Sequence, residues 1–290
     1  MENYIPTPNE ARELFKECSR LVGGGANPRI FTPQHSSTKL MHNYHITHEA
    51  EQIVCYLPQA RRGKELFDRY ASHTLRNIFN TNGFKHKNLC PHSTRGCRAT
   101  CLGYAGRLAS PPVERAMLAR YVLYVIAPAY FWVLVQDEIR QHGKRVNKHG
   151  KTLVVRFNGT SEIDIVLEPD VYDIDLFDTE YPTLFQDYTK RPISFSGYRH
   201  ASSRHYIVRS VTENDGQDVF DDHVGNLVVP VNLEKDAPLP ATFMGRPVVD
   251  GDKHDLRLLD DQQNNAVLVR VKKRNDGVRV VNDYGFIREV

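Results

Sequence analysis

Three of the five cysteines in this 290-residue chain fall within one short segment. Cys90, Cys97 and Cys101 are separated by six and then three residues, and Pro91 and Gly96 lie between them. Proline and glycine predict a loop, and cysteines clustered on a loop contribute nothing to core packing. Three thiolates on one loop can hold an iron-sulfur cluster or a zinc ion and leave one metal position open. If a metal is bound here, the fold must leave its open coordination position accessible to a substrate or cofactor.

The spacing of the cysteines bears on which metal is expected. Structural zinc sites usually pair cysteines about two to four residues apart, and only Cys97 and Cys101 meet that condition. Zinc would need Cys90 and a distant fourth ligand, for which the candidates are His86, His92, Cys18 and Cys55. Three thiolates without an obvious fourth favour an iron-sulfur cluster. Inert thiols that only pack remain the alternative.

Charge and apolar runs limit the class of protein. The net charge is +3, with 38 basic and 35 acidic side chains, so bulk electrostatics do not predict nucleic-acid binding. The start of the chain lacks the basic and apolar pattern of a secretory signal, so we expect a cytoplasmic protein with thiols rather than disulfides. The apolar run from 116 to 135 contains Arg120 and Pro128. It predicts a buried helix split at Pro128, not a membrane span.

The chain changes texture along its length. Residues 1–80 predict a helical N-terminal extension, with a helix over 10–21 capped by Asn9 and another over 64–79. Residues 81–290 predict an α/β domain that carries the cysteine loop, then a long helix over 112–142. The later apolar runs predict short strands, at 153–157, 183–185, 193–195, 206–208, 227–231, 248–249 and 267–271.

Several of these strands are followed by polar clusters, such as those at 158–162, 187–190 and 250–252. Strands that end in polar loops are typical of an α/β barrel, in which the chemistry lies at the carboxyl ends of the strands. The connections after residue 181 are too short for a full eight-fold barrel. The expected fold class is therefore α/β, a partial or irregular (β/α) barrel with the helical N-terminal extension.

The ordered motifs over about residues 88–287 resemble a family of uncharacterised phage-encoded proteins. They are Cys90-Pro91, Gly96-Cys97, Cys101-Leu102, Ala105-Gly106-Arg107, Arg156-Phe157-Asn158-Gly159-Thr160-Ser161, Asp187-Tyr188-Thr189-Lys190, Val249-Asp250-Gly251-Asp252 and Asp255-Leu256-Arg257. The resemblance implies a phage protein in the cytoplasm of an infected bacterial host. It also implies a distant likeness to radical-SAM barrels, in which three cysteines hold a four-iron (4Fe-4S) cluster and the open iron binds S-adenosylmethionine. The cysteine spacing here is longer than is usual in those enzymes.

The polar clusters then acquire roles that depend on the cluster. Residues expected to bind a cofactor form one strand-end loop, Asn158, Gly159, Thr160, Ser161 and Glu162, of which Glu162 would accept from an amine. Three candidate catalytic residues follow the next strand: Asp187 as an acid, Tyr188 as a radical-accessible phenol and Lys190 as an anion anchor. The alternatives are a helix-capping turn and a strand end with solvated charges.

A further acidic cluster, Asp250, Asp252 and Asp255, lacks the spacing of a calcium loop. It predicts a turn centred on Gly251, with Arg257 pairing one of the aspartates. His42, His45 and His48 recur at three-residue steps, and we expect ordinary histidines there.

Three functions remain open. The first is an iron-sulfur enzyme that modifies a nucleotide, a nucleic acid or a protein in the infected host. The second is a zinc-stabilised nucleic-acid-binding module without catalysis, whose basic rim would be Lys85, Lys87, Arg95, Arg98 and Arg107. The third is a phage interaction or structural protein. The sequence has no phosphate-binding loop, dinucleotide fingerprint, serine nucleophile elbow or zinc-protease motif.

Overall fold

The computed structural model describes residues 4–36, 40–41, 43, 46–191, 204–234, 236–260, 264–271 and 284–290. Its helices are α1 (Pro8–Leu21), α3 (Arg62–Tyr70), α4 (His73–Thr81), α5 (Arg95–Ala99), α6 (Pro111–Ile126), α7 (Pro128–Asn147), α8 (Leu167–Asp170) and α9 (Gln217–Asp222). Its strands are β1 (Phe31–Pro33), β2 (Ala50–Cys55), β3 (Thr152–Arg156), β4 (Thr183–Thr189), β5 (His205–Ser210), β6 (Leu227–Val231), β7 (Thr242–Phe243), β8 (Arg246–Asp250) and β9 (Ala266–Arg270).

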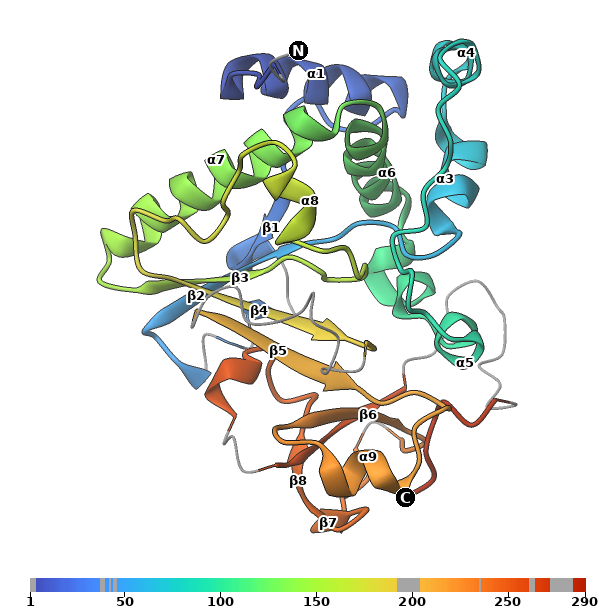
Figure 1. Cartoon of the computed structure of the whole chain (residues 1–290), viewed down its shortest axis with the longest axis vertical. Coiled ribbons are helices and arrows are strands. Elements are labelled where there is room, and N and C mark those ends of the chain that lie inside the picture. Colours follow the sequence, from blue (N-terminus) through green and yellow to red (C-terminus); the bar gives the residue numbers. More distant parts are fainter. Residues whose placement is uncertain are drawn as a thin grey trace.

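The strands form one sheet in the order β1-β2-β3-β4-β5-β6-β9-β8-β7. Every pairing from β2 through to β8 is parallel, and only the edge strands β1 and β7 pair antiparallel. Strands β2 to β6 lie side by side in chain order, as in a (β/α) barrel, but the sheet stays open (Figure 1). The expected α/β partial or irregular barrel is confirmed.

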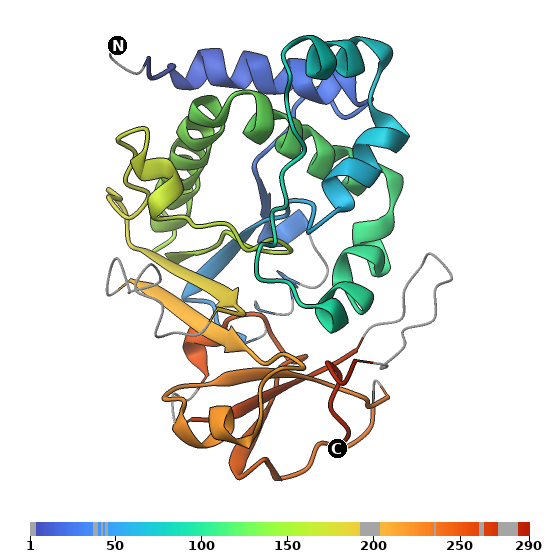
Figure 2. The same ribbon diagram turned by 45° about the vertical axis from the view of Figure 1, so that its right-hand side comes forward.

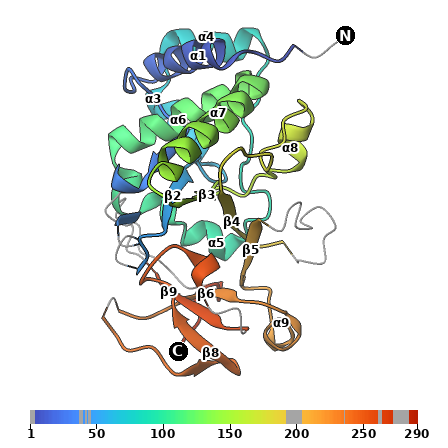
Figure 3. The ribbon, with the colours of Figure 1, turned by 90° about the vertical axis from the view of Figure 1, so that its left-hand side faces the viewer.

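Helices cover the first half of the sheet in two layers. Helix α7 lies against β3, α6 packs beside α7, and α1 lies across both helices on the side away from the sheet (Figure 3). Alternation along β3 directs Leu153 and Val155 into this core, where they meet Phe131 and Trp132 of α7. Burial of such large apolar side chains supplies most of the driving force for folding.

A smaller core supports the second half of the sheet. Val229 and Leu268, from β6 and β9, pack with Phe220 of α9. The opposite face of the same strands is covered more thinly by Tyr206, Val249 and their neighbours. Each half of the sheet thus has its own hydrophobic core, which fixes the carboxyl ends of its strands.

Several expected elements are confirmed. Six of the seven predicted strands correspond to β3, β4, β5, β6, β8 and β9, and the seventh, at 193–195, lies outside the described residues. The long helix is split at Pro128 into α6 and α7, because proline at the first position of a helix needs no intrahelical N–H partner.

Two helix predictions need correction. Helix α1 is capped by Thr7, not Asn9, because Thr7 and Glu10 form a reciprocal capping box and Pro8 occupies the first helical position. The predicted helix over 64–79 is two helices, because the Ser72 side chain accepts from the Leu75 N–H and caps α4.

The first 80 residues contain strands as well as helices. Strands β1 and β2 were not predicted, and β2 pairs with β3 inside the sheet. A boundary at residue 80 between an extension and a main domain stays a prediction, although β2 already belongs to the sheet. None of the helices in the described ranges is both long and apolar enough to span a membrane.

Candidate functional site

A cavity of about 600 Å³ opens at the carboxyl ends of the parallel strands. Figure 2 shows the arrowheads of β4 and β5 directed toward the segment that carries α5. The lining residues come from the cysteine loop and from the ends of β3, β4, β5, β6 and β9, and they include Cys90, Cys97, Cys101, Arg156, Asn158, Gly159, Thr160, Ser161, Tyr188, Lys190, Ser210, Pro230, Asp255 and Arg270. Segments remote in sequence therefore meet at one place, as the open-barrel topology requires.

The cysteine loop has a fixed local structure. The Asn88 side chain accepts from the Cys90 N–H at 2.9 Å. Thr94 caps the short helix α5, since its hydroxyl accepts from the Cys97 N–H at 3.2 Å. The Glu213 carboxylate, from beyond β5, accepts from the Thr94 hydroxyl and from the Gly96 N–H, at 2.5 and 2.7 Å. The loop is thus tied to the far half of the sheet.

All three thiols of the loop line the cavity. The Cys90 thiol donates to the Thr160 carbonyl at 3.4 Å, and burial raises its pKa to about 12. Burial also raises the pKa of Cys97, against the opposing effect of the Lys190 ammonium. All five cysteines are free thiols in this structure. Cys18 and Cys55 are buried in the main core.

The loop after β3 is shaped by its own side chains. The Asn158 amide donates to the Ile163 carbonyl, and its oxygen accepts from the Ser161 hydroxyl at 2.9 Å. A Cβ on Gly159 would lie 2.7 Å from the Cys55 carbonyl oxygen, so only glycine fits between β2 and this loop. The Thr160 hydroxyl donates to the Leu57 carbonyl at 2.6 Å. Asn158 and Ser161 therefore hold the loop in shape.

Glu162 ends this loop with a buried carboxylate. One oxygen, Oε1, accepts from the Thr189 hydroxyl at 2.7 Å and from the Lys190 N–H at 2.6 Å. The other, Oε2, has no hydrogen-bond partner among the described residues, although the side chain is only 2% exposed. An unpaired buried carboxylate oxygen is costly, and such an atom is a candidate ligand contact.

Strand β4 places the three candidate catalytic residues on two faces. Tyr188 and Lys190 line the cavity. Asp187 is one position removed and lies on the opposite face, where it accepts from the Asn158 N–H at 2.6 Å and lies 3.7 Å from the His205 ring. Burial tends to lower the pKa of Lys190, but Cys97 and Glu162 outweigh it and raise that pKa above its ordinary value.

An ion pair between Arg156 and Asp255, to which sequence reasoning gave no role, forms part of the cavity wall. Arg156, at the end of β3, donates twice to the Asp255 carboxylate, at 2.6 and 2.8 Å, and its guanidinium lies 4.3 Å from the Tyr188 ring centroid. The predicted pairing of Arg257 with that aspartate cluster is wrong: Arg257 pairs with Asp260.

The turn centred on Gly251 is present, but another arginine pairs with its aspartates. The Asp250 side chain accepts from the Asp252 N–H at 3.0 Å, which closes the predicted turn. Arg270 of β9 pairs with both carboxylates, at 2.9 and 3.3 Å. This cluster is satisfied as an ion-pair network, as the absence of a calcium-loop spacing led us to expect.

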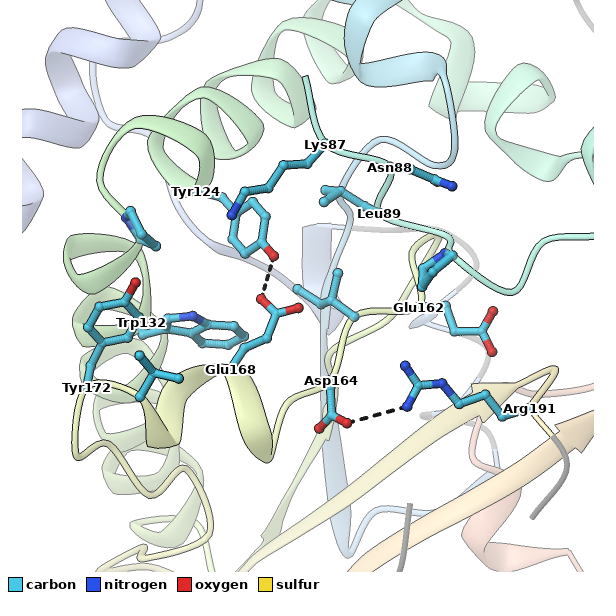
Figure 4. Close-up of a pocket in the computed structure, with 14 residues that line it drawn as sticks. Lys87, Asn88, Leu89, Tyr124, Trp132, Glu162, Asp164, Glu168, Tyr172 and Arg191 are labelled. Carbon is cyan, nitrogen blue, oxygen red and sulfur yellow. Dashed lines mark hydrogen bonds and ion pairs between the residues drawn. The ribbon is translucent and has the colours of Figure 1, made fainter. Parts of the chain in front are cut away.

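A second pocket, of about 510 Å³, lies beside the cysteine loop on its other side. Figure 4 shows Trp132, Tyr124 and Tyr172 on one wall, with Tyr124 donating to Glu168. Arg191 pairs with Asp164 on the other, at 3.5 Å. In the same view the Glu162 carboxylate points away from these aromatic rings. Glu162 lines this second pocket, whereas its neighbour Ser161 lines the cavity that holds the three thiols.

The candidate fourth ligands do not join the cysteines. His86 stacks between Phe79 and Tyr121, and His92 contacts Arg191 Nε at 2.5 Å. Across the described ranges, no group of three or more His, Cys, Asp or Glu side chains is close enough to hold a metal ion. His42 and His45 lie outside those ranges. The predicted metal ligands Cys90, Cys97 and Cys101 all line the cavity, but in this structure they are not grouped closely enough to hold a metal ion, and their metal stays a prediction.

Sequence reasoning missed Arg156, Glu213, Arg270 and Tyr284. A charged residue that ends an otherwise apolar strand was the available signal for Arg156. For Glu213 and Tyr284 the sequence offered none, because each acts through partners far along the chain.

A family model described as Gene product 88 matches residues 56–288, which is most of the chain. The match begins directly after β2, ahead of the motifs at 88, and includes the cysteine loop and strands β3 to β9. No curated protein and no solved structure matches the chain. The resemblance to a phage-encoded family is confirmed, and the likeness to radical-SAM barrels stays a prediction. The chain belongs to the Gene product 88 family, a phage-type family.

Proposed function

We propose that this phage protein is an iron-sulfur enzyme in which Cys90, Cys97 and Cys101 hold the cluster at the carboxyl edge of the sheet. The observation that carries the proposal is that all three thiols line one cavity together with Lys190 and the strand-end loops. Thiolates are the usual ligands of iron-sulfur clusters. The Lys190 ammonium acts to lower the pKa of Cys97, against the larger effect of burial, which raises it.

The donor set suits a cluster with one iron free of protein ligands. The remaining cysteines, Cys18 and Cys55, are buried in the core away from the loop. When bound, such a cluster supplies an open coordination position and an electron for the cleavage of S-adenosylmethionine. The cavity offers room for a cofactor of that size beside the thiols.

We assign Glu162, which follows the cavity-lining Ser161 and itself lines the adjoining second pocket, to the amino group of S-adenosylmethionine. Its Oε1 is fixed by Thr189 and Lys190, and its buried Oε2 lacks a partner among the described residues. A charge-assisted bond from an ammonium group would satisfy that oxygen. Gly159 and Thr160 would bring their backbone to the same cofactor, while Asn158 and Ser161 keep the loop in shape.

Tyr188 and Lys190 are assigned to the substrate side of the cavity. The Tyr188 phenol is the radical-accessible group, and the Arg156 guanidinium over its ring fixes its position. Lys190 is the anion anchor between the thiols and the substrate. Asp187 is a positioning residue, because it holds the Asn158 backbone from the opposite face.

Titration of S-adenosylmethionine into anaerobically purified protein tests the proposal. Glu162→Gln keeps the shape of the side chain and removes its charge. We expect it to weaken binding by about 10-fold or more, since a hydrogen bond to a charged group contributes about 1.5–3 kcal/mol. The matched control is Glu13→Gln, the same substitution at an exposed glutamate of α1 that lines neither pocket. Equal affinities for the parent protein and Glu162→Gln, or no release of 5′-deoxyadenosine under reducing conditions, would contradict the assignment.

A further inference from the structure

The lining of the cavity carries an excess of positively charged side chains. Six basic side chains line the cavity against three acidic ones, and they are Arg61, Arg95, Arg98, Arg156, Lys190 and Arg270 against Glu65, Asp252 and Asp255. Asp255 is bound by Arg156, and Asp252 by Arg270. Glu65 pairs with Arg62, which is not a lining residue. The carboxylates that line the cavity are thus already paired, and they are not the partners of Arg61, Arg95 and Arg98 at its mouth.

Three arginines at this mouth are exposed and have donors to spare. In the described part of the chain, the Arg61 guanidinium makes neither a hydrogen bond nor an ion pair. Arg95 lies 4.4 Å from the Tyr284 ring centroid. Arg98 donates to the Ser93 carbonyl at 2.5 Å through one of its nitrogens. The planar guanidinium fork matches phosphate geometry, so these side chains form a phosphate-binding rim.

Aromatic rings stand beside this rim. Tyr104, Tyr284 and Phe286 line the same cavity and are half-buried. The Arg62 guanidinium lies 4.4 Å from the Tyr104 ring centroid, which holds that ring in place. Aromatic faces next to a cationic track are the features with which proteins bind single-stranded nucleic acid, by stacking bases and neutralising phosphates.

We propose that the cavity mouth binds a single strand of nucleic acid, with its phosphates on Arg61, Arg95 and Arg98 and one base stacked in the cavity near Tyr104. This deepens the proposed function, on which it rests, by naming the substrate class of the iron-sulfur site. A base must leave its stack to enter a cavity, and this costs least in a strand without a complement. Duplex should therefore bind more weakly than single strand.

Fluorescence anisotropy with a labelled mixed-sequence oligonucleotide of about 20 nucleotides tests this inference. The test variant is Arg61→Glu/Arg95→Glu. Its matched control is Lys144→Glu/Lys148→Glu, which makes the same charge change at two exposed lysines at the end of α7. Loss of two phosphate contacts predicts about 10- to 100-fold weaker binding at about 50 mM salt, and a shallower salt dependence. The control should bind as the parent protein does.

A second variant separates stacking from charge. Tyr104→Leu keeps the net charge and removes the ring, and we expect about 5-fold weaker binding or more from the loss of one stacked base. Unchanged affinity in Arg61→Glu/Arg95→Glu would overturn the proposal. So would equal binding of the duplex or of polyglutamate, because that would show a general affinity for acidic polymers, including acidic proteins.

Iron content, measured on the same preparations, keeps the two proposals distinguishable. A strand-binding protein without iron would overturn the proposed function and leave the nucleic-acid site standing. An iron-loaded protein that binds no strand would overturn the present inference alone.

Discussion

Removal of the Asp255 carboxylate should destabilise the fold strongly. Asp255→Ala leaves the Arg156 guanidinium without its carboxylate in a site where the two side chains are only 6% and 13% exposed. Two unit charges about 4 Å apart interact by about 4 kcal/mol at an effective dielectric constant near 20. Breaking a buried pair from one side costs about 3–5 kcal/mol. We therefore expect a loss of about 3–5 kcal/mol in the free energy of unfolding.

Urea denaturation measures this loss through the single tryptophan. Trp132 is fully buried against α6 and β3, so its emission reports on the main core. The transition midpoint should fall by on the order of 1–2 M. The control is Arg156→Gln/Asp255→Ala, which removes both charges and should be more stable than Asp255→Ala alone. A loss below about 1 kcal/mol, or strictly additive single and double variants, would refute the assignment of a coupled pair.

Three other changes follow from the same structure. Gly159→Ala should cost about 1–3 kcal/mol and lower the iron content, because its Cβ would meet the Cys55 carbonyl, and Gly150→Ala, where a Cβ has open space but φ is +66°, controls for backbone strain alone. Thr94→Ala should cost about 0.5–2 kcal/mol in thermal denaturation by uncapping α5, and Thr94→Ser should restore it. Burial lowers the pKa of His142 to about 4, so the unfolded chain binds the extra proton below about pH 6.5 and stability should fall from there toward pH 4. In His142→Gln, the loss of unfolding free energy between about pH 6.5 and pH 4 should be smaller by on the order of 1–2 kcal/mol, as measured by urea titrations at successive pH values. A loss equal to that of the parent protein would contradict the reasoning.

Local patterns predicted most of the sheet and the cysteine loop. The apolar runs that became β3, β6 and β9 are buried on both faces, so they read as strands without help from their partners. Strand β2 was missed because its run begins with Ala50, Glu51 and Gln52, and its pairing with β3 is a contact across about 100 residues of chain. The polar residues at the start of β2 interrupt the apolar pattern, so the strand is recognised only from its pairing with β3.

The site was predicted in part, and the errors have a geometric cause. Asp187 and Tyr188 are adjacent in sequence and therefore point to opposite faces of β4, so one polar cluster could not supply both to the cavity. The Arg156–Asp255 pair joins residues 99 positions apart, which only the folded sheet brings together. Residue type and strand end located the cavity, while the choice of face within each strand required the structure.

Iron and sulfide analysis of protein purified without oxygen, together with its ultraviolet-visible spectrum, tests the central claim most directly. The comparison is the triple variant Cys90→Ser/Cys97→Ser/Cys101→Ser, with Cys18→Ser as a control in the buried core. We predict about four irons and four sulfides per chain, lost in the triple variant and retained in the control. Zinc alone, or no metal in either protein, would contradict the iron-sulfur account.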